Sequence, residues 1–228
     1  MLEVKALNQR YGKKQVLNNV SFTIEAGEIT GLIGVNGTGK TTLMKCIMNL
    51  TPKQSGEILL DGKPVTQKEM ERLIFVPDEI SVLKNMTVGE SLDYMATYYQ
   101  RYNPERASDL LTFFNLDPDA PIHTFSKGNI AKINLLMSLA IDSDYLLLDE
   151  PFSGIDIFTR EEMRNVFSSD LLQGKGVLIS THDIEEIDTF LDHVLIMEEG
   201  EIVRDFYAEE ARLEGLSVID VLREVHGK

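Results

Sequence analysis

The sequence predicts an α/β fold with three parts: a core with a mainly parallel sheet, an N-terminal antiparallel β subdomain and an inserted α-helical subdomain. The runs YLLLDE and GVLISTH are continuously apolar, as in parallel strands that are buried on both faces. Near the N-terminus apolar and polar residues alternate, which is typical of antiparallel strands. Residues 87–142 contain helix-start patterns and no convincing strand pattern.

The first part of the chain supplies the antiparallel strands and the first buried strand. Val20, Phe22 and Ile24 alternate with polar neighbours, and Ile58 precedes a turn with the sequence Asp-Gly. Between these strands, EITGLIG predicts a buried strand that runs into a glycine-rich loop and then a helix over 41–50.

The middle of the chain predicts helices. Thr87 with Glu90 forms the pattern of a capping box, and Asn103 before a proline has the order of another helix start. The apolar spacing after Ser126 predicts a third helix that begins there.

After these helices the chain returns to the core. A helix is expected from about Asp156 and another from Asp183, where Glu186 completes a cap. HVLIMEEGEIV predicts a hairpin, and a polar helical tail follows. We therefore expect one domain over 1–228, made of a β subdomain plus core over 1–77 and 143–228 and a helical subdomain over 78–142.

Composition limits the class of protein. The net charge of −15 leaves no basic surface for non-specific nucleic-acid binding. No apolar run approaches the roughly 18 residues that span a bilayer, and the start has no signal-peptide pattern. The single cysteine, Cys46, fits a reducing cytoplasm. We therefore expect no nucleic-acid partner, and contact with a membrane only through a partner protein.

Residues 34–41 read GVNGTGKT and match the phosphate-binding pattern G-x-x-x-x-G-K-[ST] at every fixed position. In such a P-loop the backbone N–H groups surround the β-phosphate, Lys40 reaches the β/γ-oxygens, and the Thr41 hydroxyl takes one Mg²⁺ position. A chance glycine-rich turn is the alternative, but the strand before and the helix after fit the motif. The sequence therefore predicts a P-loop NTPase core, a class that includes kinases, GTPases and transport ATPases.

A second motif, YLLLDEP, separates these classes. Four apolar residues place Asp149 at the C-terminal end of a buried strand, where ligands bind in open α/β sheets. Asp149 is expected to hold Mg²⁺ through water, and Glu150 to orient or deprotonate an attacking water. Two acids that merely cap a strand end are the alternative. The guanine motif Asn-Lys-x-Asp does not occur, which argues against a GTPase.

With these motifs and FSKGN in order, the chain resembles an ATP-binding cassette (ABC) ATPase over nearly its whole length. FSKGN stands where that family has Leu-Ser-Gly-Gly-Gln, with three of the five positions changed. The resemblance implies that Ser126 and Gly128 hold the γ-phosphate of ATP bound to another subunit, in a head-to-tail dimer. Lys127 either adds charge toward that phosphate or faces solvent. Without the other motifs, an ordinary serine-capped helix is the simpler interpretation.

The resemblance implies further contacts with ATP. Tyr11 looks like the aromatic residue on which adenine stacks, with a packed tyrosine at a strand end as the alternative. The segment SGID resembles the loop that crosses the dimer seam, and its Asp156 also fits a helix N-cap. The segment STHD matches the switch, in which His182 hydrogen-bonds the γ-phosphate and acts with Glu150 and Lys40 in catalysis. The remaining implied contacts with ATP are Val16, Gly34, Asn36, Gly37, Thr38, Gly39, Lys40, Thr41 and Thr42.

One position departs from the family pattern. In the run IFVPDE, Asp78 stands where the family has a glutamine. An ionised aspartate only accepts hydrogen bonds and is one methylene shorter. Asp78 therefore either serves Mg²⁺ through a bridging water or is a solvated loop acid.

Four tyrosines fall on one predicted helix in SLDYMATYYQRY, at Tyr94, Tyr98, Tyr99 and Tyr102. The resemblance implies a groove there that grips a short helix of a membrane subunit, and tyrosines suit such an interface. Packing inside the subdomain's own core is the alternative.

Together these features predict an ATP-binding and ATP-hydrolysing subunit, with ATP and Mg²⁺, that powers a membrane ABC transporter through dimerisation as a homodimer or a paired cassette. The VPDE loop and the Ser-Lys-Gly segment resemble drug, peptide or bacteriocin-immunity exporters. The expected partner is a transmembrane permease, which would hold the chain on the cytoplasmic face of the cell membrane. A soluble ABC ATPase without transport is the alternative. A small P-loop kinase would not need Ser126 or His182.

Overall fold

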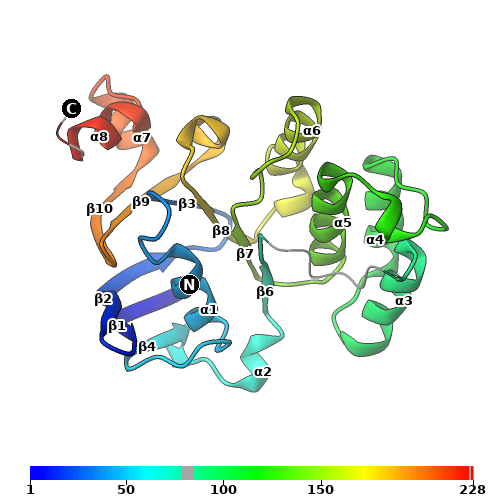
Figure 1. Cartoon of the computed structure of the whole chain (residues 1–228), viewed down its shortest axis with the longest axis horizontal. Helices are drawn as coiled ribbons and strands as arrows, with labels where there is room; N and C mark the ends of the chain where they lie inside the picture. The colour runs from blue at the N-terminus through cyan, green and yellow to red at the C-terminus, as the bar shows by residue number, and fades with distance from the viewer. Residues whose placement is uncertain (79–84, 226, 228) are drawn as a thin grey trace.

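A computed structural model describes residues 1–78, 85–225 and 227 (Figure 1). The strands are β1 (Leu2–Tyr11), β2 (Lys14–Ile24), β3 (Ile29–Ile33), β4 (Ser55–Leu60), β5 (Lys63–Pro64), β6 (Leu73–Val76), β7 (Tyr145–Asp149), β8 (Gly176–Thr181), β9 (His193–Glu198) and β10 (Glu201–Tyr207). The α-helices are α1 (Lys40–Ile47), α2 (Gln67–Met70), α3 (Val88–Tyr98), α4 (Pro104–Phe113), α5 (Lys127–Leu139), α6 (Ile157–Phe167), α7 (Ala208–Leu213) and α8 (Val218–Val225). The α/β fold class predicted from the sequence is confirmed.

The main sheet has the strand order β10-β9-β3-β8-β7-β6, in which only the β10–β9 pair is antiparallel. Every residue of β7 and β8 is buried, as their continuous apolar runs predict. On β7, Leu146 and Leu148 join one hydrophobic core with residues of α5 and α6, while Leu147 joins a second core with residues of α1. The two faces of the sheet are therefore covered by different elements, and α1 and α5 lie on opposite sides of β7 (Figure 1).

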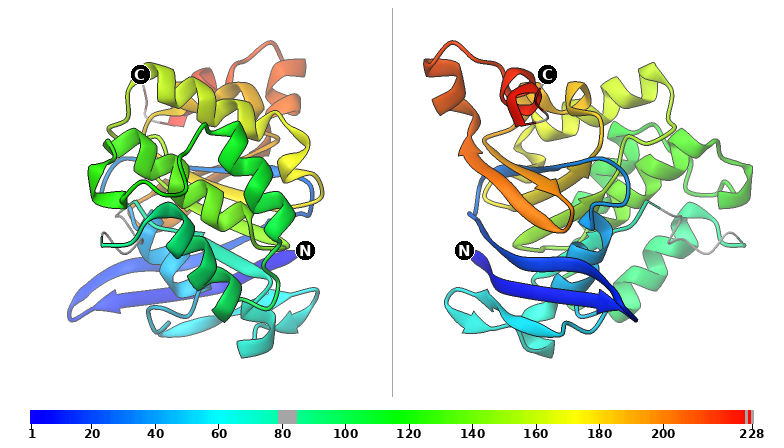
Figure 2. Two further views of the ribbon diagram at one scale, coloured as in Figure 1. Left: turned by 90° about the vertical axis from the view of Figure 1, so that its right-hand side faces the viewer. Right: turned by 60° about the vertical axis from the view of Figure 1, so that its left-hand side comes forward.

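The antiparallel sheet has the order β2-β1-β4-β5 and shares its core with α1. Val20, Phe22 and Ile24 are buried along β2, as their alternation predicts. Asp61 and Gly62 both have positive φ between β4 and β5, which suits a tight hairpin turn. In the right-hand view of Figure 2, β1 and β2 lie below β9 and β10.

Helices α3, α4 and α5 begin at the caps that the sequence predicts. Thr87 and Glu90 form the capping box of α3, and Asn103 caps α4 with a proline at its first position. Ser126 caps α5 and accepts a hydrogen bond from the N–H of Asn129. Figure 2 shows these helices together at one side of the molecule.

Two predicted helices have different ends. Helix α1 ends at Ile47 instead of Leu50, because Asn49 adopts the left-handed conformation that terminates helices. Helix α3 ends at Tyr98, so the prediction of all four tyrosines on one helix was wrong. The chain beyond it pairs with residues 140–142 through hydrogen bonds from Asn103 N to Ala140 O and from Asp142 N to Arg101 O.

The helix expected from Asp183 is also different. The segment forms two short 3-10 turns, η3 (Ile184–Glu186) and η4 (Asp188–Phe190). Asp183 does cap the first turn, by accepting a hydrogen bond from the N–H of Glu185. Glu186 takes no part in that cap, because its side chain is buried beside Thr181 and Arg160.

Candidate functional site

The glycine-rich loop joins the buried strand β3 to α1. Gly37 and Gly39 have φ of +89° and +114°, a region that side chains disfavour. A Cβ on Gly39 would lie 2.8 Å from the carbonyl oxygen of Val16, so only glycine fits there. The loop therefore curls closely around the start of α1, whose first-turn N–H groups have no partner within the helix. Such a helix start binds anions well.

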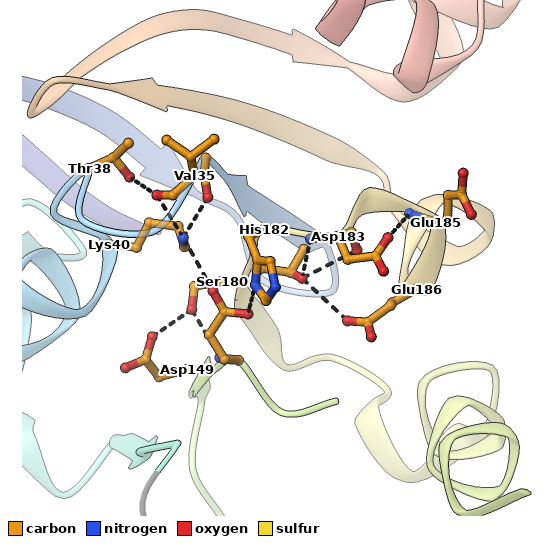
Figure 3. A network of polar contacts seen from close by, with 12 residues as sticks. Val35, Thr38, Lys40, Asp149, Ser180, His182, Asp183, Glu185 and Glu186 are labelled. Carbon is orange, nitrogen blue, oxygen red and sulfur yellow. Dashed lines mark hydrogen bonds and ion pairs between the residues drawn. The ribbon is translucent and has the colours of Figure 1, made fainter. Parts of the chain in front are cut away.

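Lys40 connects this loop to the end of β7. Its side chain is buried, and Nζ donates a hydrogen bond of 2.6 Å to the Gly34 carbonyl. The same Nζ lies 3.2 Å from Oε1 of Glu150, close enough for an ion pair. Figure 3 shows Lys40 reaching from its loop toward the ends of the central strands.

Asp149 and Glu150 stand at the carboxyl end of β7 and are held by one neighbour, Ser180 of β8. Ser180 Oγ donates a 2.6 Å hydrogen bond to Asp149 Oδ1 and accepts one from the N–H of Glu150 at 3.1 Å. Glu150 has φ of +49°, an uncommon conformation for a residue with a side chain. Strained backbone of this kind is enriched at functional sites. We did not predict this part for Ser180, because it depends on the register of β7 and β8, which places Ser180 opposite Asp149.

His182 completes the arrangement around Glu150. Its Nδ1 lies 2.8 Å from Oε2 of Glu150, so the carboxylate is held between Lys40 on one oxygen and His182 on the other. Oε1 of Glu150 is buried and makes an ion pair with Lys40 but no hydrogen bond within the described residues. That oxygen therefore keeps a capacity to accept a hydrogen bond that no described residue uses.

A cavity of about 450 Å³ opens beside these acids. Asp78, Asp149 and Glu150 all line it, although Asp78 comes from the end of another strand, β6. Glu79, the next residue of the VPDE loop, lies outside the described residues. The structure thus brings the three predicted acids to one place. In the described part of the chain, no group of three or more His, Cys, Asp or Glu side chains could hold a metal ion on its own.

The FSKGN segment forms the start of α5. Ser126 caps the helix, so the cap interpretation holds whether or not the segment also binds phosphate. A Cβ on Gly128 would lie 2.8 Å from Oγ1 of Thr159, which shows that the first turns of α5 and α6 touch. Lys127 extends its ammonium group toward Gly154 in the SGID loop. The segment and that loop therefore form one continuous edge.

The other residues expected to contact ATP lie around the glycine-rich loop or at the β1 end. Tyr11 is half exposed at the last position of β1, so it is not the packed tyrosine of the alternative interpretation. Thr38 is buried and its hydroxyl donates to the Val35 carbonyl. The loop residues Asn36, Gly37 and Thr41 are exposed.

A second cavity, of about 530 Å³, lies between α3 and the core. Tyr94 and Tyr99 line it, together with five methionines: Met48, Met70, Met86, Met95 and Met137. Tyr102 instead packs partly against the hydrophobic core, as the alternative interpretation proposed. No helix of the described residues is long and apolar enough to cross a membrane.

The fold and the site define a P-loop ATPase: a glycine-rich loop and its lysine face a carboxylate and a histidine at the ends of parallel strands. The family model described as "ABC transporter" matches residues 17–153. The chain belongs to this family, in which it is an ATP-binding and ATP-hydrolysing subunit.

Relatives and a solved structure extend the likeness to the whole chain. The Nod factor export ATP-binding protein I of Burkholderia lata is 34% identical over 99% of this chain and 76% of its own length. The lantibiotic transport ATP-binding protein SrtF of Streptococcus pyogenes is 30% identical over 89% of both chains. The aliphatic sulfonates import ATP-binding protein SsuB of Corynebacterium glutamicum is 35% identical over 87% of this chain and 81% of its own. A solved ATP-binding subunit of an ABC transporter superposes with a TM-score of 0.87, at 26% identity and over 100% of both chains.

Proposed function

We propose that Glu150 is the catalytic base for ATP hydrolysis, with His182 and Lys40 as its partners. The observation that supports this role is the Glu150 carboxylate, held 3.2 Å from Lys40 Nζ and 2.8 Å from His182 Nδ1. A carboxylate fixed at both oxygens can orient a water molecule toward a γ-phosphate and accept its proton. The ammonium group of Lys40 then stabilises the negative charge that accumulates on the β/γ-oxygens during phosphoryl transfer.

The same site suits MgATP. Thr41, in the first turn of α1, would supply a hard oxygen ligand of the kind that Mg²⁺ prefers, and Asp149 and Asp78 would hold the ion through water. Mg²⁺ usually keeps several waters and phosphate oxygens as ligands, which fits the lack of a protein-only metal cluster among the described residues. When bound, the ion neutralises the charge on the β/γ-oxygens. The nucleotide contacts are those of the P-loop, with Val16 and Thr42 beside it and Tyr11 stacked on adenine.

A second copy of the chain, or a paired cassette, completes the site. In this head-to-tail arrangement Ser126, Lys127 and Gly128 face the γ-phosphate held by the partner. Support comes from the first turn of α6, next to that segment, where Ile157 and Phe158 are 76% and 79% exposed. Large apolar side chains with this exposure, placed together at the edge of a functional segment, mark an interaction surface.

The partner in the membrane is a transmembrane permease, docked on the 530 Å³ cavity that tyrosines and methionines line. Methionines adapt to the shape of an inserted helix, and tyrosines bury area while keeping a polar end. In this arrangement residues 78–142 form the helical subdomain, residues 1–77 and 143–228 form the rest of the domain, and the chain lies on the cytoplasmic face.

We favour an exporter, like the relatives named for export and lantibiotic transport. Uptake of substrate into right-side-out vesicles that contain the permease would contradict that direction.

Glu150→Gln tests the catalytic assignment. The amide keeps the size and the contact with Lys40 but cannot accept a proton, so the variant should bind MgATP normally and hydrolyse it about 10²-fold more slowly or worse. Calorimetry measures binding, and phosphate release measures turnover. Glu185→Gln, an exposed acid nearby, is the matched control and should keep the original rate. Normal turnover of Glu150→Gln would show that another group activates the water.

A further inference from the structure

Glu186 is a buried acid that the proposed chemistry does not use. It follows His182 by four residues, and its side chain turns inward while the neighbouring Glu185 faces solvent. Burial raises its pKa, and the nearby Asp183 adds to that effect, while Arg160 and His182 oppose it. A buried carboxylate costs free energy unless it is paired, so its partners indicate what it does.

The first partner of Glu186 lies on the strand that carries the switch. Its Oε2 is 3.4 Å from the hydroxyl of Thr181, the residue directly before His182. The Thr181 hydroxyl also accepts a hydrogen bond from the N–H of Asp183 at 3.0 Å, so it closes the turn on which His182 stands. In Figure 3, Asp183 and Glu186 both lie to the right of His182.

The second partner lies on α6. Oε1 of Glu186 forms an ion pair of 3.1 Å with Arg160, and Arg164 one turn later donates to the carbonyls of Glu186 and Glu185 at 2.6 and 2.5 Å. Helix α6 starts at Asp156, the last residue of the SGID loop, and its first turn touches the start of α5 at Gly128. The turn with His182 is therefore attached to the N-terminal half of α6, close to the residues of the proposed dimer edge.

We propose that Glu186 is a positioning residue: together with Arg160 it fixes the turn 181–186 to α6, and so holds His182 against Glu150. This inference rests on the proposed function of His182. Because α6 also begins at the dimer edge, a shift of its first turn on dimer formation is transmitted to His182 through these two side chains. The ion pair between Arg160 of α6 and Glu186 of η3 thus links the proposed interface to the contact between His182 and Glu150.

The direct test removes the carboxylate and its neighbour in parallel. Glu186→Ala removes the ion pair with Arg160 and the contact with Thr181, and leaves only the bonds from Arg164 to the backbone of residues 185 and 186. Hydrogen exchange of the peptide over 181–187 should therefore become at least tenfold faster at the N–H of Asp183. The ATPase kcat should fall about tenfold while KM for ATP and ATP affinity stay unchanged. Glu185→Ala, whose side chain is exposed, should change none of these values. Unchanged exchange in Glu186→Ala would overturn the proposal.

A double mutant separates positioning from a general loss of structure. If Glu186 acts through His182, adding Glu186→Ala to His182→Ala should lower kcat no further than His182→Ala does alone. An additional, multiplicative loss would show that Glu186 supports the enzyme by another route and would refute the inference. Full activity of His182→Ala would instead refute the proposed role of the histidine. Arg160→Ala should reproduce the exchange and kcat changes of Glu186→Ala, since it removes the other half of the ion pair.

Discussion

Phe158→Ser should weaken ATP-dependent dimerisation without weakening ATP binding to the monomer. Phe158 is 79% exposed in the single chain, so nearly its whole side chain is available to a partner. Complete burial of a phenylalanine contributes about 1.5–3 kcal/mol, so the exposed share is worth about 1–2.5 kcal/mol for each copy. Two symmetric copies give about 2–5 kcal/mol, which corresponds to a dimer Kd at least about 30-fold higher.

The assay needs a dimer that hydrolysis does not dissolve. We would add Phe158→Ser to the Glu150→Gln background and measure the dimer Kd with saturating MgATP by sedimentation equilibrium. Leu213→Ser is the matched control, because Leu213 is 82% exposed on α7, away from the α5–α6 edge. An unchanged Kd for Phe158→Ser, or an equal rise for Leu213→Ser, would refute the assignment of this edge to the dimer.

Three further outcomes are expected. Ser126→Arg should abolish the same dimer, because it removes one charge-assisted hydrogen bond per site, each worth about 1.5–3 kcal/mol. It should leave ATP binding to the monomer intact. Light scattering measures the dimer and calorimetry measures ATP binding on the same sample. Lys40→Ala should weaken ATP binding, and unchanged affinity by calorimetry would contradict the P-loop assignment. Burial lowers the pKa of Lys175 from 10.5 to about 8 in the folded chain. Between pH 8 and pH 10.5 the unfolded chain therefore binds more protons at this site than the folded chain, and the free energy of unfolding should rise with pH. Urea unfolding across that range should show a smaller rise in Lys175→Met.

Much of the nucleotide site could be predicted because its residues are fixed by local rules. A P-loop needs glycines where the backbone has positive φ, and Gly37 and Gly39 have it. Asp149 could be placed at a strand end because a continuous apolar run predicts a buried parallel strand, and the strand is found as expected. Caps such as Thr87 and Asn103 are equally local, since each satisfies N–H groups only two or three residues away.

The predictions that failed involve contacts between distant segments. Helical spacing continues past Tyr98, but the helix ends there and the chain turns to pair Asn103 with Ala140, and nothing in the local pattern indicates that pairing. In the same way Asp183 and Glu186 have the spacing of a capping box. The structure instead uses Glu186 to reach Arg160, which lies 26 positions earlier by number (186 − 160) and in another helix. A spacing rule cannot anticipate a partner that the tertiary fold supplies.

The exposed pair at the start of α6 shows why burial adds information that sequence pattern lacks. Ile157 and Phe158 follow an N-cap aspartate, where apolar residues normally predict a helix face directed into the core. The structure instead leaves both side chains in solvent, while Thr159 of the same turn packs on Gly128. An apolar pair outside the core costs solubility, and in a chain with a net charge of −15 a second copy is also repelled. Apolar contact between Ile157 and Phe158 of the two copies would oppose this charge repulsion next to the γ-phosphate that bridges them. The exposure of these two side chains in the single chain is therefore consistent with a role in the dimer.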